Sequence, residues 1–157
     1  MLLLRAFISF LVLPGVVAGL VPALIVTRDV HRGPGSDWGW ALLVPGFCLL
    51  LWCVRDFYVS GRGTLAPWDP PRRLVIVGLY RRVRNPMYVS VLTLLLGWSL
   101  AAGSVRVAGY AAVVVLIFHL RVIYYEEPHL RKLFGAEWTA YAASVPRWLP
   151  RLRVTKG

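Results

Sequence analysis

The residues best suited to chemistry in this sequence form two clusters, separated by two long apolar runs. The first cluster extends from Gly78 to Tyr88 and contains Arg84, Asn85 and Pro86 in succession. Proline suits the first turn of a helix, where free N–H groups and the helix dipole attract an anion. The guanidinium of an arginine holds a carboxylate through two parallel hydrogen bonds. The cluster therefore predicts a carboxylate-binding site at a helix N-terminus.

The second cluster places Arg121 shortly before two adjacent acids, Glu126 and Glu127, at the end of an apolar run. Adjacent acids at the end of a membrane helix are unusual, because burial penalises their charge. Paired with Arg84 or Arg121, they predict a polar pocket between helices, whose carboxylates accept hydrogen bonds from hydroxyl or amino groups. Taken singly, such arginines are ordinary topology signals and such acids a solvated helix cap. The chemical interpretation depends on the two clusters meeting.

The composition indicates that lipid surrounds the elements that position these clusters. The chain has 157 residues, which is room for a single domain, 1–157, and 58% of them are hydrophobic. Its mean hydropathy is +0.63. A soluble domain of this size cannot bury so much apolar surface, because small proteins keep a large surface for their volume.

Four apolar stretches are long enough, or nearly so, to cross a bilayer as helices of about 20 residues. They predict an all-α, polytopic membrane protein with transmembrane helices at 6–26, 38–59, 86–102 and 105–125. The loop 60–85 and the tail 126–157 then lie on the same side of the membrane. In the tail, the apolar spacing predicts an amphipathic helix over 126–143 that buries one face against the end of the bundle.

Charge gives the orientation. The net charge is +11, from 18 Lys and Arg against 7 Asp and Glu, and most of the arginines lie between or after the apolar runs. Loop 60–85 and tail 126–157 carry most of this charge, so the positive-inside rule places both, and both termini, in the cytoplasm. We therefore expect a multi-pass protein of the inner, cytoplasmic membrane and no nucleic-acid partner.

Several smaller features bear on partners and on local structure. Cys48 and Cys53 are five residues apart in one helix, which favours neither a disulfide nor a metal site, and we expect both to be buried. Gly15 and Gly19 permit a homodimer through close helix approach.

The pair Arg55–Asp56 is expected to be an interfacial charge pair, although ionisable groups there are often functional. The short run 74–79 either lies at the interface or folds back toward the bundle.

Together the clusters resemble a known family. The run Gly-x-Tyr-Arg-x-x-Arg-x-Pro-x-Tyr, and a downstream Glu-Glu-x-x-Leu-x-x-x-Phe-Gly-x-x-Trp-x-x-Tyr-x-x-x-Val-Pro, resemble the isoprenylcysteine carboxyl methyltransferase and phospholipid methyltransferase-like superfamily. The resemblance covers about 61–150, and the first two apolar runs match only in being apolar. Eukaryotic carboxyl methyltransferases carry His where this chain has Asn85. Unlike His, Asn cannot titrate near neutral pH, so Asn85 cannot act as a general base.

This resemblance implies S-adenosylmethionine as the cofactor, bound at the cytoplasmic face in a pocket that the loop and the amphipathic tail helix cover. By position it implies these cofactor-binding residues: Tyr80, Arg84, Asn85, Pro86, Met87, Tyr88, Glu126 and Glu127. Catalytic roles fall to Arg84, Arg121 and Glu127, which would orient the reactants. No metal is implied.

The expected reaction is in-line attack by a lipophilic acceptor, small or lipid-anchored, on the methyl group of the sulfonium. The acceptor would arrive from the bilayer, and its nucleophile is left open as a carboxylate, an amine or a thiol. Two alternatives remain. One is an NADPH-dependent membrane reductase of the sterol-reductase type, which ends in a similar aromatic and Val-Pro segment. The other is a non-enzymatic membrane subunit.

Overall fold

The computed structural model describes residues 11–61 and 73–150, and every regular element among them is a helix. In chain order these are η1 (Leu11–Leu20), α2 (Val21–Arg28), α3 (Asp37–Gly61), η2 (Gly78–Arg81), α4 (Pro86–Ala102), α5 (Val105–Arg121), η3 (Val122–Glu126) and α6 (Glu127–Ser144). The turns of η1 and η3 are wider than α-helical, and η2 is a tight 3₁₀ turn. The first predicted span, 6–26, starts outside the described residues.

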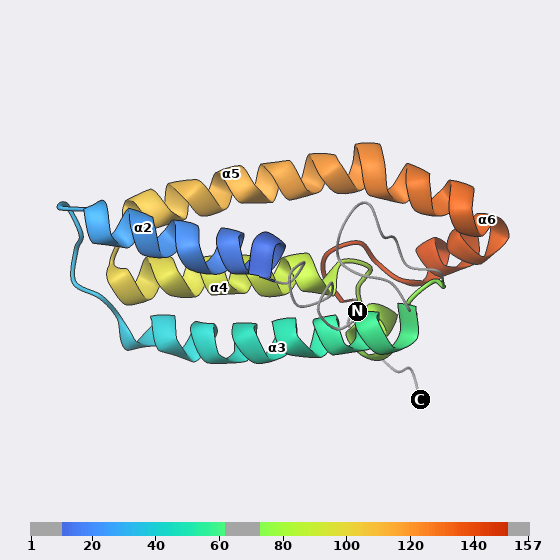
Figure 1. Cartoon of the computed structure of the whole chain (residues 1–157), viewed down its shortest axis with the longest axis horizontal. Helices are drawn as coiled ribbons and strands as arrows, with labels where there is room; N and C mark the ends of the chain where they lie inside the picture. The colour runs from blue at the N-terminus through green and yellow to red at the C-terminus, as the bar shows by residue number, and fades with distance from the viewer. Residues whose placement is uncertain (1–10, 62–72, 151–157) are drawn as a thin grey trace, which may run out of the picture.

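The long helices lie side by side along the long axis of the molecule, and α6 lies at one end together with η2 (Figure 1). We call this end, where loop 73–85 also lies, the α6 end. Helix α3 packs most extensively against α4. The two helices approach closely because Gly97 faces the Gly39 carbonyl, where a Cβ would come within 3.0 Å of that oxygen.

Two helices are long and apolar enough to cross a membrane. One is Asp37–Ser60, and the other is the continuous helical stretch Val105–Ser144. Pro14–Arg28 and Pro86–Ala102 are shorter apolar helices. Large apolar side chains face outward along the bundle, for example Phe47 on α3 and Ile117 on α5. Contiguous exposed apolar surface of this kind suits lipid and not water.

At the end opposite α6, a buried acid ties the α2–α3 loop to the start of α5. The Asp29 carboxylate accepts a hydrogen bond from the Ser104 hydroxyl at 2.5 Å and from the His31 backbone N–H at 3.2 Å. Arg106 approaches the same carboxylate at 3.5 Å. The Ser104 hydrogen bond outweighs burial and holds the pKa of Asp29 below its usual value. A cavity of about 480 Å³ opens beside this loop, lined by Arg32 among others.

The segment 74–77 folds back toward the bundle, which settles the choice that the sequence left open. Its side chains alternate, as expected of extended chain. Val75 and Val77 pack beside Cys53 of α3, while Leu74 and Ile76 pack on the α6 side. The segment therefore forms a wedge that joins α3 to α6. Cys48, contrary to expectation, is exposed on the outer face of α3, whereas Cys53 is buried.

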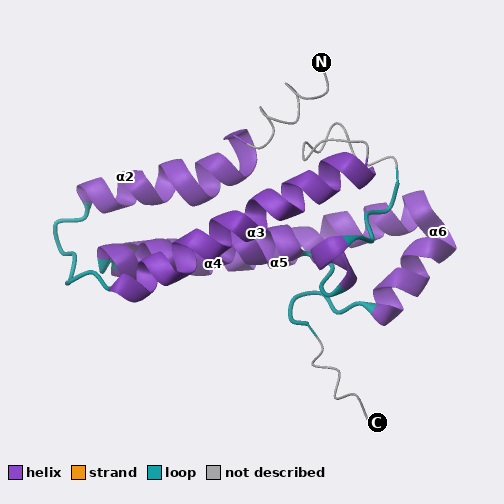
Figure 2. Ribbon diagram, turned by 90° about the horizontal axis from the view of Figure 1, so that it is seen from below, coloured by secondary structure: helices purple, strands orange, loops and turns teal. Residues whose placement is uncertain are grey.

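Helix α6 turns back on itself and closes this end of the bundle (Figure 2). The turn is made at Gly135, whose φ of 51° and ψ of −119° are accessible to glycine and strained for other residues. The second half of α6 thereby brings Trp138 and Tyr141 against the wedge, together with Val145 beyond the helix. The Phe-Gly step in the sequence thus has a structural reason.

Candidate functional site

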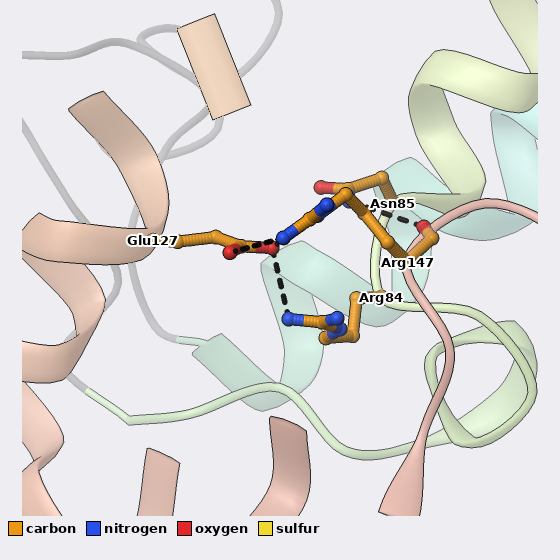
Figure 3. A network of polar contacts seen from close by, with 4 residues as sticks. All are labelled: Arg84, Asn85, Glu127 and Arg147. Atoms are coloured by element: carbon orange, nitrogen blue, oxygen red, sulfur yellow. Dashed lines mark hydrogen bonds and ion pairs between the residues drawn. The ribbon is translucent and has the colours of Figure 1, made fainter. Parts of the chain in front are cut away.

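The chain that follows α6 crosses the N-terminus of α4. The Arg84 backbone N–H donates to the Pro146 carbonyl at 2.8 Å. The Asn85 side-chain amide donates to the Arg147 carbonyl at 3.2 Å (Figure 3). These bonds position two residues of the first cluster against the segment 145–150. The amide of Asn85 therefore has a structural task that needs a hydrogen-bond donor and no titratable group.

Glu127 lies at the centre of the first ion-pair network. Its Oε1 accepts from Arg84 Nη1 at 2.8 Å and from Arg147 Nε at 2.7 Å, and its Oε2 accepts from Arg147 Nη2 at 2.8 Å. Figure 3 shows the two guanidinium groups reaching this carboxylate from different segments of the chain. The Arg147 contact is bidentate, which is the strongest geometry for an arginine and a carboxylate.

Burial makes this network sensitive to the loss of any member. The side chains of Arg84 and Glu127 are only 13% and 15% exposed. Burial raises the pKa of Glu127, but the hydrogen bonds from Arg147 and the charge of Arg84 outweigh it and leave the pKa below its ordinary value. Burial also lowers the pKa of Arg84, which Glu127 opposes. An arginine nevertheless stays charged at any physiological pH.

Arg84 has more donors than its described partners use. Its Nε is buried and has no hydrogen-bond partner in the part of the chain that the structure describes. Its guanidinium carbon lies 5.9 Å from the centre of the Trp138 ring, within the range of a cation–π contact. A buried guanidinium with an unused N–H favours an anionic partner.

Glu126 carries a second, parallel network. Its Oε1 accepts from Arg121 Nε at 2.8 Å and also from the hydroxyl of Tyr88, which comes from the first turn of α4. The Tyr88 ring packs against Phe118, with ring centres 4.3 Å apart, and its centre is 6.4 Å from that of Trp148. The rings of Tyr88, Phe118 and Trp148 thus form an aromatic cluster beside the Glu126 carboxylate.

The structure brings five of the predicted site residues into these two networks: Arg84, Tyr88, Arg121, Glu126 and Glu127. Asn85 joins them through the Arg147 carbonyl. Tyr80 and Pro86 are buried, and Met87 packs with Tyr80 against α3. The Tyr80 carbonyl also accepts the Tyr141 hydroxyl at 2.7 Å. Tyr80, Pro86 and Met87 therefore belong to the packed interior and take no part in either ion-pair network among the described residues.

Arg147, Trp138 and Trp148 contact the networks but are not among the predicted site residues, although Trp138 is part of the downstream motif that carries the resemblance. Trp138 follows the Phe-Gly step, and Arg147 and Trp148 belong to the Val-Pro-Arg-Trp sequence. The usable signal for Arg147 is its position just after a helix that must pack back on the bundle. Without the turn at Gly135, however, that helix would not carry Arg147 toward Glu127.

Comparison with protein families identifies the family of this chain. Residues 37–137, more than half of the chain, match the phospholipid methyltransferase family. No curated protein and no solved structure gave a match. The matched region extends from the start of α3 into α6 and contains the Arg84–Glu127 and Arg121–Glu126 pairs. The chain is a member of the phospholipid methyltransferase family.

Proposed function

We propose that this protein is an integral-membrane methyltransferase that uses S-adenosylmethionine to methylate a lipophilic acceptor, in the manner of isoprenylcysteine carboxyl methyltransferases. The observation that carries the proposal is the meeting of two arginine–glutamate pairs at the α6 end. The Arg84–Glu127 pair joins residues that are distant in the sequence, and the Arg121–Glu126 pair lies at the end of α5. Aromatic rings lie beside both pairs: Trp138 beside Arg84, and Tyr88 beside Glu126.

The residues present fit the cofactor. The unused Nε of Arg84 suits a carboxylate, such as that of the methionine part. The Glu126 and Glu127 carboxylates suit ribose hydroxyls or an amino group, and the faces of Tyr88 and Trp148 suit an adenine ring. When bound there, S-adenosylmethionine supplies an electrophilic methyl group on a positively charged sulfur.

The contribution of the protein is then to position and to exclude water. Arg84 and Arg121 orient carboxylates, and Glu127 holds both Arg84 and Arg147 in place. The segment 145–150 and the second half of α6 cover this end of the bundle. Positioning alone accounts for a large part of the rate enhancement expected for a reaction with so good a leaving group.

The proposal includes a topology. Helices α3 and α5 span the membrane, and the shorter apolar helices η1–α2 and α4 complete four spans. The α6 end then faces the cytoplasm, as do both termini, and the Asp29 end faces the opposite side. This orientation puts most of the arginines inside. The cofactor reaches the site from the cytoplasm and the acceptor from the bilayer.

Isothermal titration of the purified, detergent-solubilised protein with S-adenosylhomocysteine tests the proposal. We expect micromolar affinity, weakened at least about tenfold by Arg84→Ala because a charged hydrogen bond is lost. Arg82→Ala is the matched control, since Arg82 is an exposed neighbour. Titration with NADPH tests the reductase alternative. Binding of NADPH in place of S-adenosylhomocysteine, or of neither, contradicts the proposal.

A further inference from the structure

The Asp29 end of the bundle, opposite α6, holds a cavity of about 480 Å³ beside the α2–α3 loop. Its lining comes from two segments that are distant in the sequence: the loop between Thr27 and Gly35, and Ala101 and Ala102 of α4. Cavities of this size are typical of small-ligand sites in proteins. The two arginine–glutamate networks lie at the other end of the bundle, so the proposed methyl transfer gives this cavity no task.

The loop that lines the cavity is held firmly against the end of α4. The Gly33 backbone N–H donates to the Gly103 carbonyl at 2.9 Å. A Cβ at Gly35 would collide with the Ala101 carbonyl, so glycine is needed for this close approach. The contacts of Asp29 with the start of α5 hold the other end of the loop. The wall of the cavity is therefore fixed before a ligand arrives, which lowers the cost of binding.

The charges around the cavity favour an anion. The side chain of Asp29 is only 2% exposed, and Ser104 and Arg106 already hold its carboxylate. Arg32 lines the cavity, is exposed, and forms no ion pair among the described residues. Arg28, in the last turn of α2, is exposed as well. With the charge of Asp29 compensated, the cavity keeps a positive charge, and a guanidinium binds phosphate oxygens in a bidentate manner.

The end of α4 gives the cavity hydrogen-bond acceptors. Ala101 and Ala102 are the last two residues of this helix, where carbonyl groups have no partner within the helix. Such carbonyls accept hydrogen bonds from hydroxyl groups. An ammonium group also donates hydrogen bonds, but Arg28 and Arg32 repel its charge. The cavity therefore suits a ligand that joins a phosphate to one or more hydroxyl groups.

Exposed aromatic and apolar side chains favour the membrane as the source of such a ligand. Trp38 and Trp40, in the first turn of α3, are 76% and 64% exposed. Exposed tryptophans are enriched where a bilayer meets water. From Trp40 an exposed apolar stripe continues along α3 through Val44, Phe47 and Leu51, at the spacing of one helix face. This stripe gives the acyl chains of a lipid a surface that begins at the same end of the molecule as the cavity.

We propose that the cavity at the Asp29 end binds the headgroup of an anionic, hydroxyl-bearing phospholipid, with the phosphate on Arg32. Phosphatidylglycerol is the simplest lipid of this class. The lipid is a bound ligand and not a methyl acceptor, because the cavity lies at the end opposite the Arg84–Glu127 pair. By joining the α2–α3 loop to α4 it stabilises the fold. This inference does not depend on the proposed methyl transfer.

Native mass spectrometry of the detergent-solubilised full chain tests the inference with three lipids that share their acyl chains. These are phosphatidylglycerol, phosphatidylmethanol, which has the same charge without hydroxyl groups, and phosphatidylcholine, which has no net charge. We expect phosphatidylglycerol to be retained over phosphatidylcholine by about tenfold or more, as for one charged contact. Its advantage over phosphatidylmethanol should be about threefold, as for a neutral hydrogen bond.

Substitutions locate the binding. Arg32→Gln should remove the preference for phosphatidylglycerol over phosphatidylcholine, and Arg32→Lys should keep part of it. Arg82→Gln, a matched substitution of an exposed arginine at the α6 end, should leave the preference unchanged. Trp38→Ala should lower the retention of all three lipids without changing their order, because Trp38 is expected to contact the bilayer and not the headgroup. Added phosphatidylglycerol should raise the unfolding midpoint of the wild type but not that of Arg32→Gln, a comparison that also shows whether this variant folds.

Free glycerol 3-phosphate, offered in a separate run, distinguishes a lipid from a soluble phosphate, and it should not be retained. Four results overturn the inference. They are equal retention of phosphatidylglycerol and phosphatidylcholine, a preference that survives Arg32→Gln, an equal loss in Arg82→Gln, and retention of glycerol 3-phosphate as strong as that of the lipid. Titration of the same samples with S-adenosylhomocysteine reports separately on the proposed function, which none of these results affects.

Discussion

Glu127 illustrates what residue types and spacing predict and what they leave open. The sequence indicates that the paired acids meet Arg84 or Arg121, because each cluster lies at the same end of a long helix. It does not show which acid meets which arginine. That choice depends on the direction of each side chain at the end of α5, where the wide turn η3 rotates Glu126 toward Tyr88 and leaves Glu127 to Arg84. Spacing alone cannot reveal such a turn.

The pH dependence of stability tests the Glu127 network. Its pKa is below the ordinary value of 4.5, so the carboxylate stabilises the fold above that value and loses this effect as the pH falls through the lowered pKa. We expect the difference in unfolding midpoint between wild type and Glu127→Gln to stay constant from about pH 8 to about pH 5 and to narrow only below that. Thermal unfolding in detergent measures it. If the difference in unfolding midpoint already narrowed between pH 8 and pH 6, burial, and not the two arginines, would dominate the pKa of Glu127.

At the scale of elements, the sequence predicted helices well where strong signals bracket them. Helix α4 has the expected range 86–102 because Pro86 starts it and Gly103 follows it. The wedge 74–77 was ambiguous, since a short apolar run looks the same at an interface and in a core. Contacts with Cys53 and with Tyr141, from segments distant in the sequence, decide its place. The reversal at Gly135 depends on such contacts too.

Gly78 offers a test of how the wedge and η2 are held. Its φ is +52°, and any Cβ there would collide with the Asp56 carboxylate. We expect Gly78→Ala to destabilise the protein by about 1–3 kcal/mol, from backbone strain and the clash. Gly109→Ala is the matched control, because it lies within α5 with open space around its Cβ position, and it should be neutral or stabilising. The measurement is the unfolding midpoint of each variant in detergent. Equal midpoints for Gly78→Ala and Gly109→Ala would show that η2 accommodates a Cβ at position 78 without loss of stability.

At the scale of the whole molecule, the two ends of the bundle have different tasks. The Asp29 end is closed by the contacts of Asp29 with Ser104 and Arg106. The α6 end collects the arginine–glutamate networks and the buried Asp56. The sequence predicted this asymmetry from the distribution of arginines. The number of membrane crossings and the possible dimer through Gly15 and Gly19 remain predictions, because neither follows from the fold of one chain.

The proposed orientation is tested by single-cysteine labelling in a Cys48→Ala, Cys53→Ala background. Val30→Cys places a thiol at the Asp29 end, where Val30 is 84% exposed, and Ala143→Cys places one on exposed α6 surface. In intact cells a membrane-impermeant maleimide should label position 30 but not 143, and permeabilisation should expose 143. The reverse pattern would invert the topology and remove the cytoplasmic site.

The central claim is that a methyl-donor cofactor binds between the N-terminus of α4 and the end of α5. The most direct test is ultraviolet photolabelling of the purified protein with methyl-labelled S-adenosylmethionine, followed by peptide mapping. The account predicts label within 80–88 or 121–148, displaced by excess S-adenosylhomocysteine. Label that is displaced equally but lies beside the cavity at the opposite end, around Arg32 and Ala101, would contradict it, as would the absence of displaceable label.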